Sequence, residues 1–141
     1  MREKITVVGD AGCAARLGEG DYADVVSDPD EISGSAVVVL FEGGDDVFAQ
    51  IRRRAPNAVV VVVGASPQPA CEATLFSRSR IVGVDGADDS VVDVVEAIVM
   101  DRRRVFTCTV RCEGERGIDG EFAAVPVLLG AGGIREIVED A

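Results

Sequence analysis

The chain has 141 residues, a mass of 14.7 kDa and a formal net charge of −11 at pH 7. Its length fits one domain, or one domain with a small appendage. So acidic a protein repels phosphate backbones and anionic lipids, and neither nucleic acid nor a membrane is an expected partner. No signal-peptide pattern opens the sequence, and its apolar runs are too short to cross a bilayer, so we expect a cytoplasmic protein.

The first half of the chain alternates apolar runs with helical patterns. Short valine-rich runs predict buried strands at residues 4–9, 23–27, 36–41, 58–63 and 81–86. A small-residue segment after the first run predicts a short helix that stops at Gly18 or Gly20. Two more helices are predicted, one from Asp45 to the stop at Pro56 and one within residues 67–79. Strands that alternate with helices indicate a parallel sheet of Rossmann type.

The second half begins with the clearest predicted helix. Within residues 88–104, one apolar stripe is formed by Val91, Val94, Val95, Ile98 and Val99. Residues 105–112, 122–130 and 134–139 then predict three consecutive strands, which indicate an antiparallel unit. The predicted fold class is α/β. A reduced Rossmann-like parallel sheet (residues 1–86) precedes a C-terminal helix with antiparallel strands (residues 87–141).

The turn after the first predicted strand has the pattern of a nucleotide-binding turn. Gly9, Gly12 and Ala15 form a GxxGxxA pattern, which lets a backbone approach a dinucleotide pyrophosphate. Asp28 ends the second predicted strand, where an acidic residue would bind the ribose hydroxyls. Asp10 places a negative charge beside the pyrophosphate and opposes binding. The pattern therefore fits either a site for NAD or a turn with only a structural role, and Asp28 also fits an ordinary loop residue.

Several stretches resemble the lactate/malate dehydrogenase family, which are NAD-dependent 2-hydroxyacid enzymes. "CEGERGIDGEFAAVPVLLGAGGIREIVE" is similar to the family segment EGxYGIxxxxxGVPVxLGxxGVExIxE. "SVVDVVEAIVMDRRRVFTCTV" is similar to the helix and strand that precede it, and "KITVVGDAG" more loosely resembles the first strand and glycine loop. The resemblance implies a Rossmann-type fold, NAD as a cofactor, and assembly into dimers or tetramers.

The resemblance also implies catalytic residues that this sequence lacks. The family's base is a histidine in an HG motif, and the chain contains 0 histidines. The substrate arginine of the family's DxxR motif is replaced by Val92, if Asp89 matches the Asp. The asparagine of an SNP motif falls at Ala65 or Ser66. We therefore assign no catalytic residue and expect a miniaturised, non-catalytic homologue that acts through binding or assembly.

Two other functions stay open on the sequence alone. One is an NAD-dependent oxidoreductase of the malate or lactate type, completed by another subunit or acting on an unusual substrate. The other is an NAD-sensing module that keeps the glycine turn. The apolar tail strands favour a homo-oligomer, most simply a twofold dimer, because unpaired edges and valine faces are unfavourable in water. A compact monomer is the alternative.

The remaining chemical groups have structural interpretations. The four cysteines, Cys13, Cys71, Cys108 and Cys112, form no CxxC pair, and we expect small buried hydrophobes rather than reactive thiols. The arginine triplets at 52–54 and 102–104 fit helix C-termini, with an anion site as the alternative. The acidic residues lack a metal-ligand spacing, so no metal site is predicted.

Overall fold

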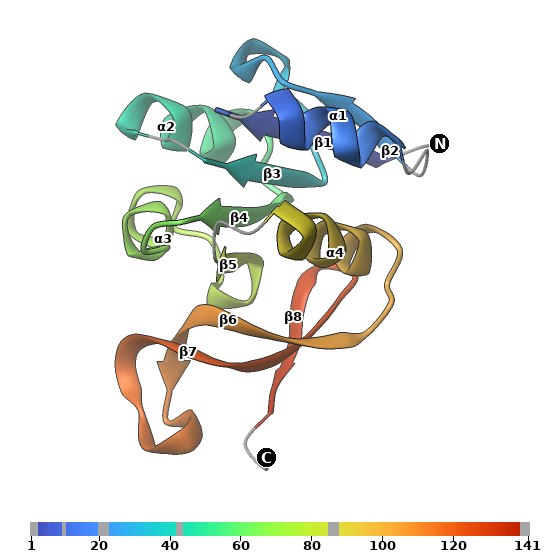
Figure 1. Ribbon diagram of the computed structural model, residues 1–141. Coiled ribbons are helices and arrows are strands. Elements are labelled where there is room, and N and C mark those ends of the chain that lie inside the picture. Colours follow the sequence, from blue (N-terminus) through green and yellow to red (C-terminus); the bar gives the residue numbers. More distant parts are fainter. Residues whose placement is uncertain (1–2, 10, 20–22, 42–43, 85–87, 139–141) are drawn as a thin grey trace.

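The computed structural model describes residues 3–9, 11–19, 23–41, 44–84 and 88–138. Within these residues an 8-stranded sheet has the order β2-β1-β3-β4-β5-β6-β7-β8 (Figure 1). The parallel part consists of β1 (Glu3–Val8), β2 (Ala23–Val26), β3 (Val37–Leu40), β4 (Val59–Val63) and β5 (Ile81–Val84). The antiparallel part consists of β6 (Arg104–Glu113), β7 (Asp119–Gly130) and β8 (Gly133–Ile137). The predicted fold class is confirmed.

Helices cover both faces of the parallel strands. α1 (Ala11–Glu19) and α4 (Asp88–Val99) lie on one face, and α2 (Asp45–Arg54) and α3 (Gln68–Thr74) lie on the other. α1 ends at Glu19, so the predicted stop at Gly18 or Gly20 is confirmed for the second of the two positions, and Gly18 lies inside the helix. α3 is shorter than predicted because Leu75 takes a left-handed backbone (φ 60) at its end, and the 3₁₀ helix η2 (Arg78–Arg80) then leads into β5. No helix in the described part of the chain could span a bilayer.

Alternate side chains of β3 and β4 enter two hydrophobic cores, one on each face of the sheet. The valine runs predicted this burial, because a strand covered on both faces needs apolar residues at every position. The first core lies under α1 and α4 and receives Val37, Val39, Val59, Val61 and Val63. The second lies under α2 and α3 and receives Val38, Leu40, Val60 and Val62. The predicted stripe of α4 packs in the first core together with the inner side chains of β6 and β7.

The tail strands continue the sheet across a narrow seam. β5 and β6 are joined by one residue pair, Gly83 opposite Thr109. β6 and β7 pair along nearly their whole lengths, with one irregularity near Glu113. At the start of β8, Gly133 has a left-handed backbone (φ 107), and a Cβ there would meet the carbonyl oxygen of Ser79. Only glycine therefore lets β8 approach η2 this closely.

An ion-pair network fastens the β6–β7 connection to η2. Arg78 donates from Nη1 to Glu115 Oε1 and from Nη2 to Glu115 Oε2, both at 2.9 Å. Arg78 Nη1 also donates to the carbonyl oxygen of Arg111 at 3.1 Å, and the backbone N–H of Glu113 donates to Glu115 Oε1 at 2.7 Å. The bond from Arg78 and that N–H lower the pKa of Glu115 to about 2.

Truncation of Leu129 should show that the tail shares its core with the parallel strands. Leu129 is fully buried in the first core, so Leu129→Ala should lower the free energy of unfolding by about 2–5 kcal/mol. Leu128→Ala is the matched control. The side chain of Leu128 is only partly buried, so this variant should lose less unfolding free energy. Chemical denaturation measures both. Equal losses, or separate transitions for the tail and the parallel strands, would contradict a shared core.

The acid stability of the chain should depend on Glu115. Its folded pKa lies below the ordinary value of 4.5, so its stabilising effect is complete above about pH 4.5 and is lost as the pH falls toward 2. Glu115→Gln should therefore flatten the decline in unfolding free energy across this pH window. Glu121→Gln, which changes an exposed acid of β7, is the control and should keep the wild-type slope. Urea titrations at several pH values test this, and identical slopes for wild type and Glu115→Gln would refute it.

Candidate functional site

The carboxyl ends of β1 to β5 meet at one edge of the sheet, here called the carboxyl edge. Ligands of such sheets bind outside the carboxyl ends of the strands, at the point where the strand order reverses. β1 lies between β2 and β3, so the reversal falls at the β1–β3 pair. This edge is therefore the first place to look for a site.

The structure places the predicted cofactor residues at or near this edge. Gly9 directly follows β1 with a left-handed backbone (φ 99), which glycine adopts without strain. Gly12 and Ala15 are exposed in the first turns of α1, and Asp28 is exposed two residues after β2. Asp10 lies outside the described residues. The positions agree with a nucleotide-binding turn, and NAD binding itself stays a prediction.

Asp28 has a local structural role. Its Oδ1 accepts the backbone N–H of Asp30 at 2.9 Å, and its carbonyl oxygen accepts the N–H of Glu31 at 2.9 Å. These bonds stabilise the short 3₁₀ helix η1 (Pro29–Glu31). The loop interpretation of Asp28 thus has direct support in the structure. A ribose would have to share this carboxylate with the backbone of η1.

A cavity of about 290 Å³ opens at the carboxyl edge beside β3 and β4. Its walls are mainly apolar and include Leu40, Phe48 and Val62. The polar side chains in the lining are the carboxylate of Asp45 and the hydroxyl of Ser66. Ala65 and Ser66, the positions at which the family resemblance places an asparagine, both line this cavity. The described lining includes no lysine or arginine. A substrate carboxylate would meet no cation there.

Negative charge dominates the start of α2 at this edge. Asp45 and Asp46 occupy the first turn, and the N-cap residue Gly44 supplies no side-chain hydrogen bond. The positive end of the helix dipole is therefore already met by the helix's own carboxylates. Each of these charges repels a unit of phosphate charge by about 0.4 kcal/mol at about 10 Å in water. These carboxylates would therefore repel a pyrophosphate at this edge only weakly.

Cations gather at the opposite edge, where the parallel strands begin, here called the amino edge. Arg52, Arg53 and Arg54 fill the last turn of α2, as predicted. The prediction that residues 102–104 end α4 is wrong, because α4 ends at Val99 and Arg104 already belongs to β6. In a parallel α/β fold the helices begin at the carboxyl edge and end at the amino edge, so charges that suit the two ends of the helix dipole separate in space. The chain is thus polarised from edge to edge.

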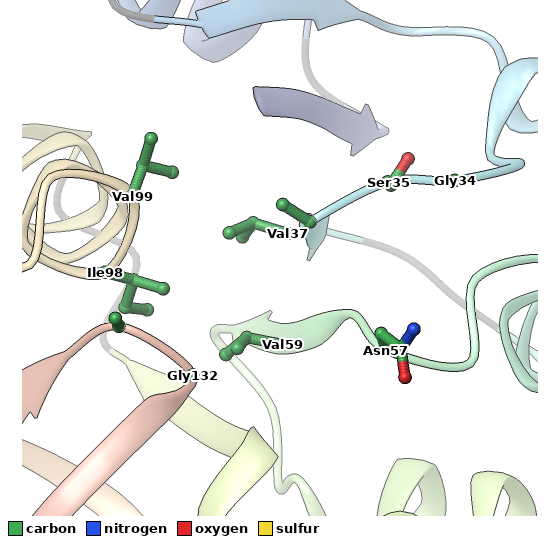
Figure 2. A pocket seen from close by; sticks show the side chains of 10 residues that line it. Gly34, Ser35, Val37, Asn57, Val59, Ile98, Val99 and Gly132 are labelled. Carbon is green, nitrogen blue, oxygen red and sulfur yellow. The ribbon is translucent and has the colours of Figure 1, made fainter. Parts of the chain in front are cut away.

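A second cavity of about 300 Å³ lies at the amino edge. Figure 2 shows Val37 and Val59 at the starts of β3 and β4, facing Ile98 and Val99 at the end of α4. Gly132 of the β7–β8 turn closes one side, and Asn57 stands near the mouth. Sequence reasoning missed this cavity because four distant segments build it, and no local pattern reports their meeting.

The cysteines behave largely as predicted. Cys108 and Cys112 are buried in the first core, and burial raises the pKa of the Cys108 thiol to about 12. Cys71 is half-buried and unpaired, and burial raises its pKa as well. The side chain of Cys13 lies outside the described part. In the portion of the chain that is described, no three His, Cys, Asp or Glu side chains are grouped to hold a metal ion.

Comparisons with known proteins connect this geometry to a family. No family model matches the chain. Malate dehydrogenase from Salinibacter ruber is 30% identical over 149 residues, covering 91% of this chain and 44% of that protein. The lactate dehydrogenase from Cryptosporidium parvum complexed with lactic acid and NAD matches the fold with a TM-score of 0.89 at 14% identity, covering 100% of this chain and 91% of that one. The chain belongs to the lactate/malate dehydrogenase family.

Two further comparisons, one of sequence and one of structure, also match malate dehydrogenases. Malate dehydrogenase from Chlorobium limicola is 52% identical over 50 residues, which are 36% of this chain and 16% of that protein. The structure of the malate dehydrogenase from Aeropyrum pernix has a TM-score of 0.79 at 16% identity, covering 96% of this chain and 90% of that one. The resemblance found in the sequence is confirmed. This dehydrogenase-family chain nevertheless spans less than half of the Salinibacter relative, so the family establishes its fold and not an activity.

Proposed function

We propose that the chain is a non-catalytic member of the dehydrogenase family that acts through binding or assembly. The observation that supports this most directly is the absence of histidine from all 141 residues. Hydride transfer to a 2-keto acid needs a positioned proton donor and a cation that holds the substrate carboxylate. The carboxyl-edge cavity offers neither among its described lining residues, whose ionisable side chain is Asp45.

The catalytic contribution of the missing proton donor and cation is large enough to argue against residual turnover. A single positioned hydrogen-bond donor contributes about 3–4 kcal/mol to transition-state stabilisation. General acid–base catalysis contributes a further factor of roughly 100 to 10,000. The loss of both leaves a bound cofactor without a reaction partner, because the protein's part in cofactor chemistry is to orient and polarise the substrate.

Purified protein should not oxidise NADH with oxaloacetate or pyruvate above the rate without enzyme. The physical reason is the missing donor and the missing cation. Absorbance at the NADH band measures the rate. The control variant is Glu19→Gln, which changes an exposed acid on α1. The chain would be an oxidoreductase if it shows turnover that Asp28→Asn abolishes and Glu19→Gln leaves intact.

An NAD-sensing module is the second candidate function. The left-handed Gly9 after β1 favours it, because this is the turn that such sites use. The carboxylates of Asp45 and Asp46 at the same edge oppose it. Calorimetric titration with NAD and NADH distinguishes the sensing role from the binding or assembly role. Heat of binding without turnover would favour the sensing role.

Assembly into a homo-oligomer is part of the proposed role. Val105 of β6 is 56% exposed and stands opposite Leu128 of β7 on the outer face of the tail strands. Met100, which precedes β6, is 45% exposed. Exposed apolar side chains on a sheet face favour coverage by another molecule, and a twofold dimer covers the same surface on both copies.

Light scattering should give a mass near twice 14.7 kDa at moderate salt. Val105→Asp should shift the mass toward that of one chain, because it places a carboxylate on the apolar face of an already acidic protein. Thr107→Asp is the matched control for charge at the next outward position of β6. A single-chain mass for the wild type at high protein concentration would refute the oligomer, and an unchanged mass in Val105→Asp would place the interface elsewhere.

A further inference from the structure

We propose that the chain forms a twofold dimer in which Val105 and Leu128 of each copy insert into an apolar groove of the other copy, between α3 and β7. The inference rests on the assembly role proposed above and names the surface that carries it. Three features of the outer face of β6 and β7 support it: a groove at one end, exposed apolar side chains at the other end, and uncharged residues between the two ends.

The groove is a cavity of about 570 Å³ between α3 and the far end of the β6–β7 ribbon. Its apolar lining comes from Leu75 and Phe76, which follow α3, and from Phe122 of β7. Its charged lining residues are Glu72 and Arg111, whose opposite charges cancel. The volume lies within the range of pockets that bury a small ligand. The groove is therefore large enough to receive side chains of another molecule.

Leu75 indicates that the groove has a use beyond the fold. Its backbone is left-handed (φ 60), which strains a bulky residue and would not strain a glycine. Its side chain is 67% exposed, so burial within the chain does little to offset this strain. Strained backbone positions of this kind commonly mark functional sites. Burial against a partner would give the exposed leucine a stabilising role.

Val105 and Leu128 form an apolar knob at the opposite end of the same face. They are paired across β6 and β7, and Val105 is 56% exposed. Arg111 and Phe122, which line the groove, are paired six residues further along the ribbon and therefore lie on the same face. Six residues of a strand span roughly 20 Å. The knob therefore cannot fill the groove of its own chain.

The ribbon between the knob and the groove is uncharged on this face. Its residue pairs are Thr107 opposite Pro126 and Thr109 opposite Ala124. In a chain of net charge −11 with 28% charged residues, two copies repel each other when acidic surfaces meet. An uncharged ribbon lets two copies approach with little local repulsion.

A second copy fits this surface better than an unrelated partner because the knob and the groove lie on one face. A twofold axis through the middle of the ribbon sets the two ribbons in opposite directions and places each knob over the groove of the other copy. Each apolar contact is then made twice, as in other twofold interfaces. An unrelated protein would have to supply both a knob and a groove of its own at the same spacing.

Cysteine cross-linking tests the contact, because the free Cys71 lines the groove. Val105→Cys, oxidised with copper phenanthroline, should give two chains joined by a disulfide on a non-reducing gel. The link should disappear when Cys71→Ser is added to this variant. Glu19→Cys is the matched control, because Glu19 is exposed on α1 at the other face of the sheet, and it should form no disulfide with Cys71. Peptide mass spectrometry identifies the joined cysteines.

Leu75→Gly separates the interface from the fold. It removes an apolar wall of the groove and relieves the left-handed backbone, so it should raise the dissociation constant of the dimer at least tenfold without lowering the Tm of the diluted chain. Light scattering over a dilution series measures the dissociation constant, and circular dichroism measures the Tm.

Three outcomes would overturn this interface: no disulfide in Val105→Cys, a disulfide that persists after Cys71→Ser, or wild-type dimerisation of Leu75→Gly. If the wild type still has a dimer mass, the assembly role stands and only the interface fails. A single-chain mass for the wild type at high concentration overturns both. The failure of this inference and the failure of the proposed assembly role are therefore distinguishable.

Discussion

Burial of β3 and β4 on both faces is the constraint on which the rest of the structure depends. Their valines enter two cores, so each face must be covered by helices. Right-handed crossovers meet this need by returning every helix to the edge where the next strand begins. Helix starts then lie at one edge and helix ends at the other. The charge polarity of the molecule follows from this arrangement together with the preference of acids for helix starts and of arginines for helix ends.

The same charge polarity determines which side chains the carboxyl edge offers to a ligand. A Rossmann-type sheet offers a ligand its carboxyl edge, and here that edge has Asp45 and Asp46 at the start of α2. The cavity beside them has apolar walls and no cation in its described lining. The sheet of this dehydrogenase family is therefore present, whereas the described lining of this cavity offers no cation to a substrate carboxylate. Fold and chemistry are independent properties of a chain.

Most of the fold could be predicted from the sequence because valine runs and the α4 stripe are strong periodic signals. The errors fell where non-glycine residues adopt left-handed backbones. Leu75 ends α3 early, and Asp101 and Arg103 turn the chain after α4, at positions where residue type predicts continuation. The glycine turn could be found from its spacing. The hydrogen bond from Asp30 to Asp28 could not, and neither could the amino-edge cavity, because both depend on how segments pack.

The narrow seam between β5 and β6 bears on how the chain could exchange parts with another copy. One residue pair, Gly83 opposite Thr109, joins the parallel strands to the tail. The tail keeps its own ladders between β6, β7 and β8 if it is lifted away. Separation therefore breaks little backbone pairing, but it also breaks the bonds from Arg78 to Glu115 and exposes the apolar contacts beneath α4. In a dimer, the tail of one chain could complete the sheet of its neighbour and form these bonds there, with the connection between α4 and β6 as the hinge of a domain swap.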